Sequence, residues 1–189
     1  MEPSLPGRAA AWDLVCHHTA SLTLRRHMLA VEAALRHLAR QRGEDEDLWG
    51  CVGLLHDFDY EQFPEAHPMS GEALLAQAGW PVVVRRAILS HSEASGVPRQ
   101  SQLELALHAC DELTGLIVAA ALVRPDKDLR QVTLASVMKR WRSPAFAAGV
   151  DRAELLAAAQ AFGVELEEHV AEVLAGMQAA AAELGLAGT

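Results

Sequence analysis

An imidazole and a carboxylate stand side by side where an apolar run ends, in the stretch Gly53-Leu54-Leu55-His56-Asp57. Imidazole together with carboxylate is a ligand set suited to iron, manganese, zinc and similar divalent ions. Because neighbouring helix residues point about 100° apart, His56 and Asp57 are better placed for different coordination positions, or for two neighbouring metals, than for a shared hydrogen bond. Further residues of these two types fall at expected helix ends or inside apolar helices: His27, His67, His91 and Asp111.

Asp111 lies in the middle of residues 101–123, the longest apolar helix that the sequence predicts. A carboxylate buried there is costly unless a cation, a metal or protonation compensates its charge. A site built from the facing helices of a bundle needs one or two inward ligands from each helix. The histidines and aspartates above come from five expected helices, so the sequence predicts a metal site in a helical bundle.

The elements that must position these residues are all expected to be helices. Within residues 21–42, apolar side chains recur at three- and four-residue steps, which is the pattern of a helix with one buried face. A loop is expected at residues 58–66, where Pro64 interrupts any helical pattern. The expected helices span residues 8–19, 21–42, about 44–57, 67–78, 81–92, 101–123, 128–142, 151–162 and 165–185.

Composition agrees with an all-α protein. Hydrophobic residues make up 51% of the 189 residues and charged ones 22%. The apolar share is carried by Ala and Leu rather than by Val, Ile and aromatic residues, which favours helix over sheet. No linker rich in Gly, Ser or Pro divides the chain, so residues 1–189 are predicted to form a single domain. Its ligand-bearing core spans about 21–124, and a C-terminal helical part spans about 125–189.

Charge and cysteine content narrow the classes of function. A formal net charge of −9 disfavours binding to nucleic-acid polymers or anionic membranes, since both need an electropositive surface. No apolar run is expected to reach the ~20 residues of a membrane span, and the N-terminus lacks a signal-peptide pattern. The three cysteines lie far apart without a Cys-x-x-Cys pairing. We therefore expect a cytoplasmic protein without disulfides.

The order His27, then His56-Asp57, then Asp111 resembles the H…HD…D signature of the HD-domain metal-dependent phosphohydrolases. The resemblance runs beyond the ligands, because the chain from about residue 26 to residue 184 is similar to small stand-alone predicted HD hydrolases. It implies an HD-domain helical bundle, here with extra C-terminal helices. The segments most similar to those proteins are residues 27–32 and 111–116.

His67 and His91 extend the resemblance, because they are similar to the intervening histidines in binuclear branches of the superfamily, including the HD-GYP type. The resemblance implies one or two divalent ions, of iron, manganese, zinc or magnesium. In the two-ion form Asp57 would bridge the ions, and His67 and His91 would hold the second. The first ion would be held by His27, His56, Asp57 and Asp111.

Two positions depart from the HD-GYP pattern. Tyr60 stands where HD-GYP enzymes have a lysine after the HD pair, which leaves the phosphate-contacting group open. Ser92 stands where they have a second consecutive histidine, which weakens the expectation of a fully ligated second metal. A GYP-type motif is absent from the sequence, so hydrolysis of cyclic di-GMP is not expected.

Residues around the ligand set have two interpretations each. Asp59 is a candidate partner for a ligating histidine or a proton acceptor in catalysis, and the alternative is a solvated loop acid. Lys139, Arg140 and Arg142 form a basic cluster that could bind a substrate phosphate, and the alternative is a solvated helix face. The remaining histidines are expected to be surface or structural residues. Among them, His108 precedes a predicted ligand by three residues and could share its helix face.

The function expected is a metal-dependent phosphohydrolase that acts on a nucleotide or another small phosphate ester through a metal-activated water. Asp57 and Asp59 are its expected catalytic residues, and a small-molecule phosphate is its expected partner. One alternative keeps the site, because some HD-fold proteins that resemble this one oxygenate small molecules at a binuclear iron site. The other alternative is a non-catalytic regulatory module that binds metal or a nucleotide.

Overall fold

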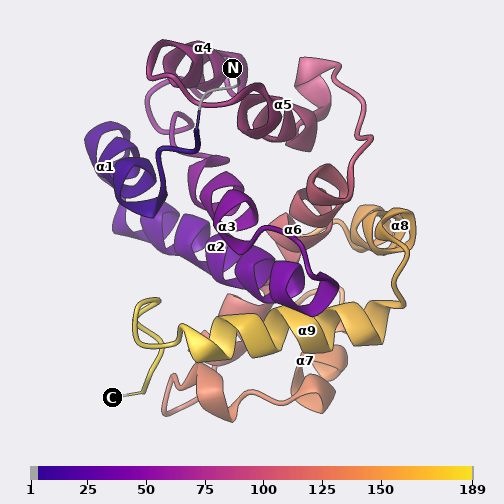
Figure 1. Ribbon diagram of the computed structural model, residues 1–189. Helices are drawn as coiled ribbons and strands as arrows, with labels where there is room; N and C mark the ends of the chain where they lie inside the picture. Colours follow the sequence, from indigo (N-terminus) through magenta and orange to yellow (C-terminus); the bar gives the residue numbers. More distant parts are fainter. Residues whose placement is uncertain (1–3, 189) are drawn as a thin grey trace.

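The fold is a bundle of α-helices, which confirms the expected all-α class. The computed structural model describes residues 4–188, and within that range it contains nine α-helices, two short 3-10 helices and no β-strand (Figure 1). The first five α-helices are α1 (Arg8–His18), α2 (Leu22–Arg42), α3 (Glu46–Leu55), α4 (Met69–Gln77) and α5 (Val82–His91). The others are α6 (Gln102–Leu122), α7 (Leu134–Trp141), α8 (Arg152–Phe162) and α9 (Leu166–Ala179), with 3-10 helices η1 (Glu93–Ser95) and η2 (Leu129–Gln131).

Polar caps and a glycine fix the ends of the helices that carry the predicted ligands. The Ser21 side chain accepts a hydrogen bond from the first turn of α2, and the helix ends at Gly43 in the left-handed conformation, with φ 69°. Asp45 caps α3 in the same way. At the start of α6, Ser101 and Glu104 form a reciprocal capping box. Because such caps satisfy the free backbone groups of the first and last turns, these helices begin and end close to their expected bounds.

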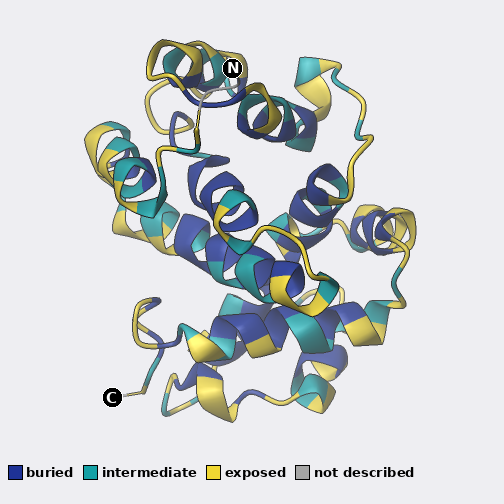
Figure 2. Ribbon diagram, in the orientation of Figure 1, coloured by how far each residue is buried: buried dark blue, intermediate teal, exposed yellow. Residues whose placement is uncertain are grey.

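Helix α2 is the centre of the bundle and packs against α3, α6 and α9. Its contact with α3 is especially close: a Cβ added at Gly53 would lie 2.9 Å from the backbone nitrogen of Glu32. The facing surfaces of these helices are the buried core, which includes Met28, Leu35 and Leu54 (Figure 2). Close packing of α2 on α3 therefore places the end of α3 next to the first turns of α2.

The remaining helices lie on opposite sides of this centre. Helices α4 and α5 pack together at one end, beyond α3, while α9 lies across α2 and α6 with α7 on its far side (Figure 1). Helix α8 packs beside α6. The C-terminal end of α5, the middle of α6 and the end of α3 consequently meet on one side of α2.

Helix α6 corrects one expectation from the sequence. The helix has 21 residues and contains an 18-residue stretch with a mean hydropathy of 1.5, so by length and composition alone it could cross a membrane. The expectation that no run reaches that length is therefore wrong. In this fold 56% of that stretch is buried, and α6 packs against α2, α5, α8 and α9. Its apolar character is therefore that of a core helix.

The C-terminal helices are shorter than expected. Asp128 caps the 3-10 helix η2, and α7 begins only after Thr133, which forms its own capping box with Ser136. Helix α9 ends at Ala179, and turns follow it. The turn at Gly185 has φ 68°, and it returns the chain so that the Leu129 N–H donates to the carbonyl of Leu186 at 2.8 Å.

Candidate metal centre

Six predicted ligands converge on one side of α2, although they come from five separate parts of the chain. They are His27 in the second turn of α2, His56 and Asp57 directly after α3, His67 in the turns before α4, His91 at the end of α5, and Asp111 in the middle of α6. Each helix or turn contributes one or two side chains, as expected for a site inside a bundle.

His27 and His56 form the first half of the cluster, with their Nε2 atoms 3.2 Å apart. The Oδ1 atom of Asp111 lies 3.0 Å from Nε2 of His27 and 3.5 Å from Nε2 of His56. The Oδ2 atom of Asp57 lies 3.7 Å and 3.5 Å from the same two nitrogens. Two imidazole nitrogens and two carboxylate oxygens thus face one another.

His67 and His91 form the second half, again with Nε2 atoms 3.2 Å apart. The Oδ1 atom of Asp57 lies 3.3 Å from Nε2 of His67 and 3.5 Å from Nε2 of His91. Asp57 therefore turns one carboxylate oxygen toward each pair of histidines. This is the placement required of a carboxylate that bridges two ions.

Hydrogen bonds at Nδ1 orient three of the four imidazoles. Nδ1 of His56 donates to the Gly53 carbonyl at 2.8 Å, and Nδ1 of His91 donates to the Ile88 carbonyl. Nδ1 of His67 lies 2.7 Å from Oδ1 of Asp59. Since a proton on Nδ1 leaves the Nε2 lone pair free in a neutral imidazole, these rings present Nε2 as a ligand atom. Such partners are typical of metal-binding histidines.

Buried charges in the cluster shift the pKa values of its members. Burial alone lowers the pKa of His56, but the carboxylates of Asp57 and Asp111 outweigh it and hold that pKa well above its ordinary value. Burial likewise opposes the two carboxylates, yet His56 and its neighbours keep the pKa of Asp57 and of Asp111 well below the ordinary range. The carboxylates are therefore ionised, which is the form that binds a cation.

The donor set fits divalent ions. Within the described residues, one group of potential ligand atoms comprises His27, His56 and Asp57, and another comprises Asp57, His67 and His91. In each group the atoms lie within 4.8 Å of one another. Nitrogen and oxygen donors of this kind suit iron, manganese and zinc, and the partly buried position limits competition from bulk water.

Comparison with protein-family models shows which family the chain belongs to. Residues 24–116 match the family model of the HD domain, and this range includes all six converging side chains. The chain belongs to the HD-domain superfamily. Comparisons with curated proteins and with solved structures give no match. The family match does not distinguish the HD-GYP branch, so that layout stays a prediction.

Asp59 lies behind the HD pair and is fully buried. One of its oxygens accepts from Nδ1 of His67, and the other accepts from the backbone N–H of Gly71 at 2.7 Å. The structure thus brings Asp59 to a predicted ligand and away from solvent. Of the interpretations given by the sequence, this contact agrees with a partner of a ligating histidine, and a solvated loop acid is excluded by the burial.

The two departures from the HD-GYP pattern have different surroundings. The Tyr60 ring packs edge-on against the ring of His67, with centroids 5.3 Å apart, and Tyr60 lines an open cavity together with His27. Ser92 caps the 3-10 helix η1, where its hydroxyl accepts from the Ala94 N–H at 3.3 Å. Tyr60 therefore lies at the site, whereas Ser92 is used in the turn that follows His91.

The predicted basic cluster lies elsewhere. Lys139, Arg140 and Arg142 are exposed on or just after α7, which packs against α6 and α9. The Arg140 guanidinium lies over the ring of Phe146, and that of Arg142 lies 3.6 Å from Glu167. In Figure 1, α7 is on the far side of α9 from α3. The structure does not bring these three residues together with the HD ligands.

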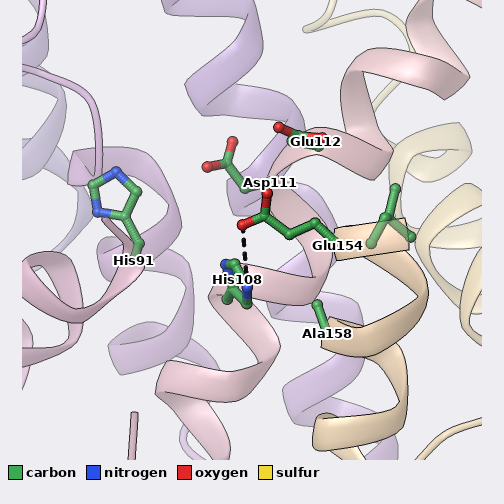
Figure 3. Close-up of a pocket in the computed structure, with 7 residues that line it drawn as sticks. His91, His108, Asp111, Glu112, Glu154 and Ala158 are labelled. Atoms are coloured by element: carbon green, nitrogen blue, oxygen red, sulfur yellow. Dashed lines mark ion pairs between the residues drawn. The ribbon is translucent and has the colours of Figure 1, made fainter. Parts of the chain in front are cut away.

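Besides the open cavity at Tyr60, two further cavities adjoin the ligands and contain residues that the sequence did not indicate. A cavity of about 100 Å³ lies beside His91 and Asp111, and the acidic side chains of Glu112 and Glu154 line it with His108 (Figure 3). A larger cavity of about 240 Å³ lies beside His27. Among its lining residues, Arg26 could have been noticed because it directly precedes a ligand. Leu184 and Leu186 gave no such signal, because only the tertiary fold returns them to α2.

Proposed function

We propose that this HD-domain protein is a metal-dependent phosphohydrolase that acts on a nucleotide or another small phosphate ester. The observation that carries the proposal is the position of Asp57, whose Oδ2 faces His27 and His56 while its Oδ1 faces His67 and His91. Membership of the HD-domain superfamily supports it, because that family consists generally of metal-dependent phosphohydrolases.

The residues of the chain have separate roles in this proposal. His27, His56, Asp57 and Asp111 would hold one ion, and Asp57, His67 and His91 would hold a second. The carbonyls of Gly53 and Ile88 and the carboxylate of Asp59 keep three imidazoles turned toward the ions. Bound divalent ions would lower the pKa of a water molecule toward neutrality and offset the charge of the phosphoryl group.

The test is metal analysis of the purified protein followed by a screen of nucleotides and phosphomonoesters. We expect the wild-type protein to contain divalent metal and to hydrolyse at least one ester. Asp57→Asn keeps the side chain's size but removes its charge and one of its two acceptor oxygens, so the variant is expected to lose metal and to fall to the background rate. Asp13→Asn, at an exposed position of α1, is the matched control and is expected to leave both unchanged.

Three results would contradict the proposal. A wild-type protein that binds no divalent metal would overturn it, as would an Asp57→Asn variant that retains both metal and activity. A protein that contains iron, shows the electron-spin signal of a mixed-valence pair and hydrolyses no ester would favour oxygenation of a small molecule instead.

A further inference from the structure

Two of the cavities that adjoin the ligands have opposite chemical character. The cavity beside His91 and Asp111 is small, about 100 Å³, and carries the carboxylates of Glu112 and Glu154. Figure 3 shows these acidic side chains grouped around it, with Glu154 paired to His108 at 3.8 Å. A cavity of this size with this charge disfavours a further anionic or bulky group of a substrate.

The cavity that lies between His27 and the C-terminal segment is larger, about 240 Å³, and its walls are mainly apolar. Val118 and Leu122 line it from α6, and Leu184 and Leu186 line it from the turns that follow α9. The second pair lies outside residues 24–116, which match the HD domain. One wall of this cavity is therefore supplied by the chain's own C-terminal segment rather than by the matched family region.

Backbone hydrogen bonds hold that C-terminal wall in place. The N–H of Leu186 donates to the carbonyl of Ala181 at 2.8 Å, and its carbonyl accepts from the Leu129 N–H at 2.8 Å. Leu184 and Leu186 are themselves buried, at 2% and 6% exposure. The wall is thus a fixed surface, which is the condition for selecting a ligand by shape.

A single cation lies at the edge of this apolar cavity. Arg26 is exposed, lines the cavity next to His27, and packs at Gly185, where an added Cβ would lie 2.9 Å from its Nη2. Within residues 4–188, no carboxylate pairs with the Arg26 guanidinium at 4.0 Å or less. An apolar wall, a cation and a predicted metal ligand therefore border one space.

We infer that this cavity is the subsite for the leaving group of the ester, and that the preferred leaving group is an apolar alcohol, alkyl or aryl, rather than a nucleoside. The inference rests on the proposed phosphohydrolase function. Hydrolysis would break the bond between phosphorus and the ester oxygen: the water oxygen joins phosphorus, and one water proton goes to the departing alcohol. Arg26, at the edge of the same cavity, offers a positive charge to the anionic phosphate, and the apolar end contacts Val118, Leu122, Leu184 and Leu186.

Burial of apolar surface predicts how steeply kcat/KM should rise with the chain length of the leaving group. Each methylene transferred from water into an apolar site favours binding by about threefold to fourfold. For a series of ethyl, butyl and hexyl monophosphates, kcat/KM of the metal-loaded full chain is therefore expected to rise by about tenfold per two methylenes. The rise ends at the chain length that fills the cavity.

Leu122→Asn tests the apolar wall, because Leu122 is 49% exposed and the change does not disturb the core. It is expected to flatten the dependence of kcat/KM on chain length, with the largest loss for hexyl phosphate and the smallest for ethyl phosphate. Leu156→Asn is the matched control, since Leu156 is 39% exposed on α8 and lines none of the three cavities beside the ligands. This variant is expected to keep the wild-type dependence. Equal kcat/KM across the series, or a preference for nucleotides over hexyl phosphate, would overturn the inference.

Binding of alkylphosphonates, measured by calorimetry, separates this inference from the function on which it rests. These compounds keep the anion and the alkyl chain but lack the bond that is hydrolysed. If no ester is turned over, yet affinity for phosphonates rises with chain length and Leu122→Asn removes the rise, the subsite is supported and the hydrolase proposal alone fails. Affinity that is independent of chain length, or the absence of phosphonate binding, would overturn the subsite.

Discussion

At the scale of single residues, Asp59 decides the orientation of a ligand without facing the cavities. Its two oxygens are used by Nδ1 of His67 and by the Gly71 N–H. Burial alone would lower the pKa of His67, but the hydrogen bonds to Asp57 and Asp59 outweigh it and raise that pKa to about 9. Removing such an outer partner typically weakens metal affinity by about 10–100-fold. Asp59→Asn is therefore expected to weaken the ion held by His67 and His91 and to leave the other ion bound, measured by metal titration against a chelator.

A second variant reaches the same contact from its other side. A Cβ at Gly71 would lie 2.8 Å from Cγ of Asp59, so Gly71→Ala is expected to displace Asp59 and to weaken the same ion. Gly149→Ala is the control, because a Cβ there meets nothing within 4 Å. If Asp59→Asn bound both ions with wild-type affinity, Asp59 would have no positioning role.

At the scale of helices, the contact of α2 with α3 sets the distance between His27 and His56. A Cβ at Gly53 would lie 2.9 Å from the Glu32 nitrogen, and backbone atoms cannot rotate away as a side chain can. Gly53→Ala is expected to lower the free energy of unfolding by about 1–3 kcal/mol or more and to weaken metal binding, because it pushes the two helices apart. Urea denaturation and metal titration measure the two effects. Wild-type stability in this variant would contradict the close packing.

The packing of α9 against α6 predicts that the folded protein loses stability in acid. His169 is fully buried, and its Nε2 donates to the Ala109 carbonyl at 2.9 Å. Burial lowers the pKa of His169. Just below the ordinary histidine pKa of about 6.5, His169 therefore binds a proton in the unfolded chain but stays neutral in the folded protein. The contribution of His169 to stability is therefore complete above about pH 6.5 and declines as the pH falls toward the lower folded pKa.

His169→Gln is expected to be less stable at neutral pH, by about 1–2 kcal/mol from poorer filling of the site, but to lose less stability between about pH 6.5 and pH 5. Urea midpoints across this range measure the slope. His17→Gln, at an exposed position, is expected to keep the wild-type slope. An unchanged slope in His169→Gln would mean that its burial is not the source of the acid sensitivity.

The sequence predicts helices best where local groups fix their ends. Ser21, Gly43, Asp45 and Ser101 are caps that act within one turn, and the helices that they bound match expectation. The C-terminal part differs because its boundaries depend on tertiary contacts. The Leu129 N–H, for example, donates to the carbonyl of Leu186, and no local pattern in residues 128–142 signals that hydrogen bond. An expected long helix there is a 3-10 helix followed by a short α7.

At the scale of the whole molecule, the ligands could be predicted but their surroundings could not. His27, His56, Asp57 and Asp111 follow a spacing that is readable along the chain, and the fold brings them together. The basic cluster at Lys139 illustrates the opposite case, because charge spacing says nothing about which side of α9 the helix occupies. Likewise, the apolar wall beside His27 depends on the return of residues 184–186, which is a property of the packed bundle.

Because the ligands come from separate parts of the bundle, metal binding is expected to stabilise the whole fold. The predicted ligands lie on α2, α5 and α6 and in the segments that follow α3 and precede α4, so ions that bind them favour the folded chain over the unfolded one. At a free metal concentration of about 100 times Kd, the stabilisation is about 2.7 kcal/mol per site, or roughly 5–10 °C in Tm for a domain of this size. Thermal unfolding before and after chelation measures the shift in Tm, and re-addition of metal is expected to restore the original Tm.

Asp57→Asn is expected to unfold at the same temperature with and without metal, because it lacks the carboxylate shared by the two groups of ligands. If chelation lowered the Tm of Asp57→Asn as much as that of the wild-type protein, the stabilising ions would have to bind elsewhere on the molecule.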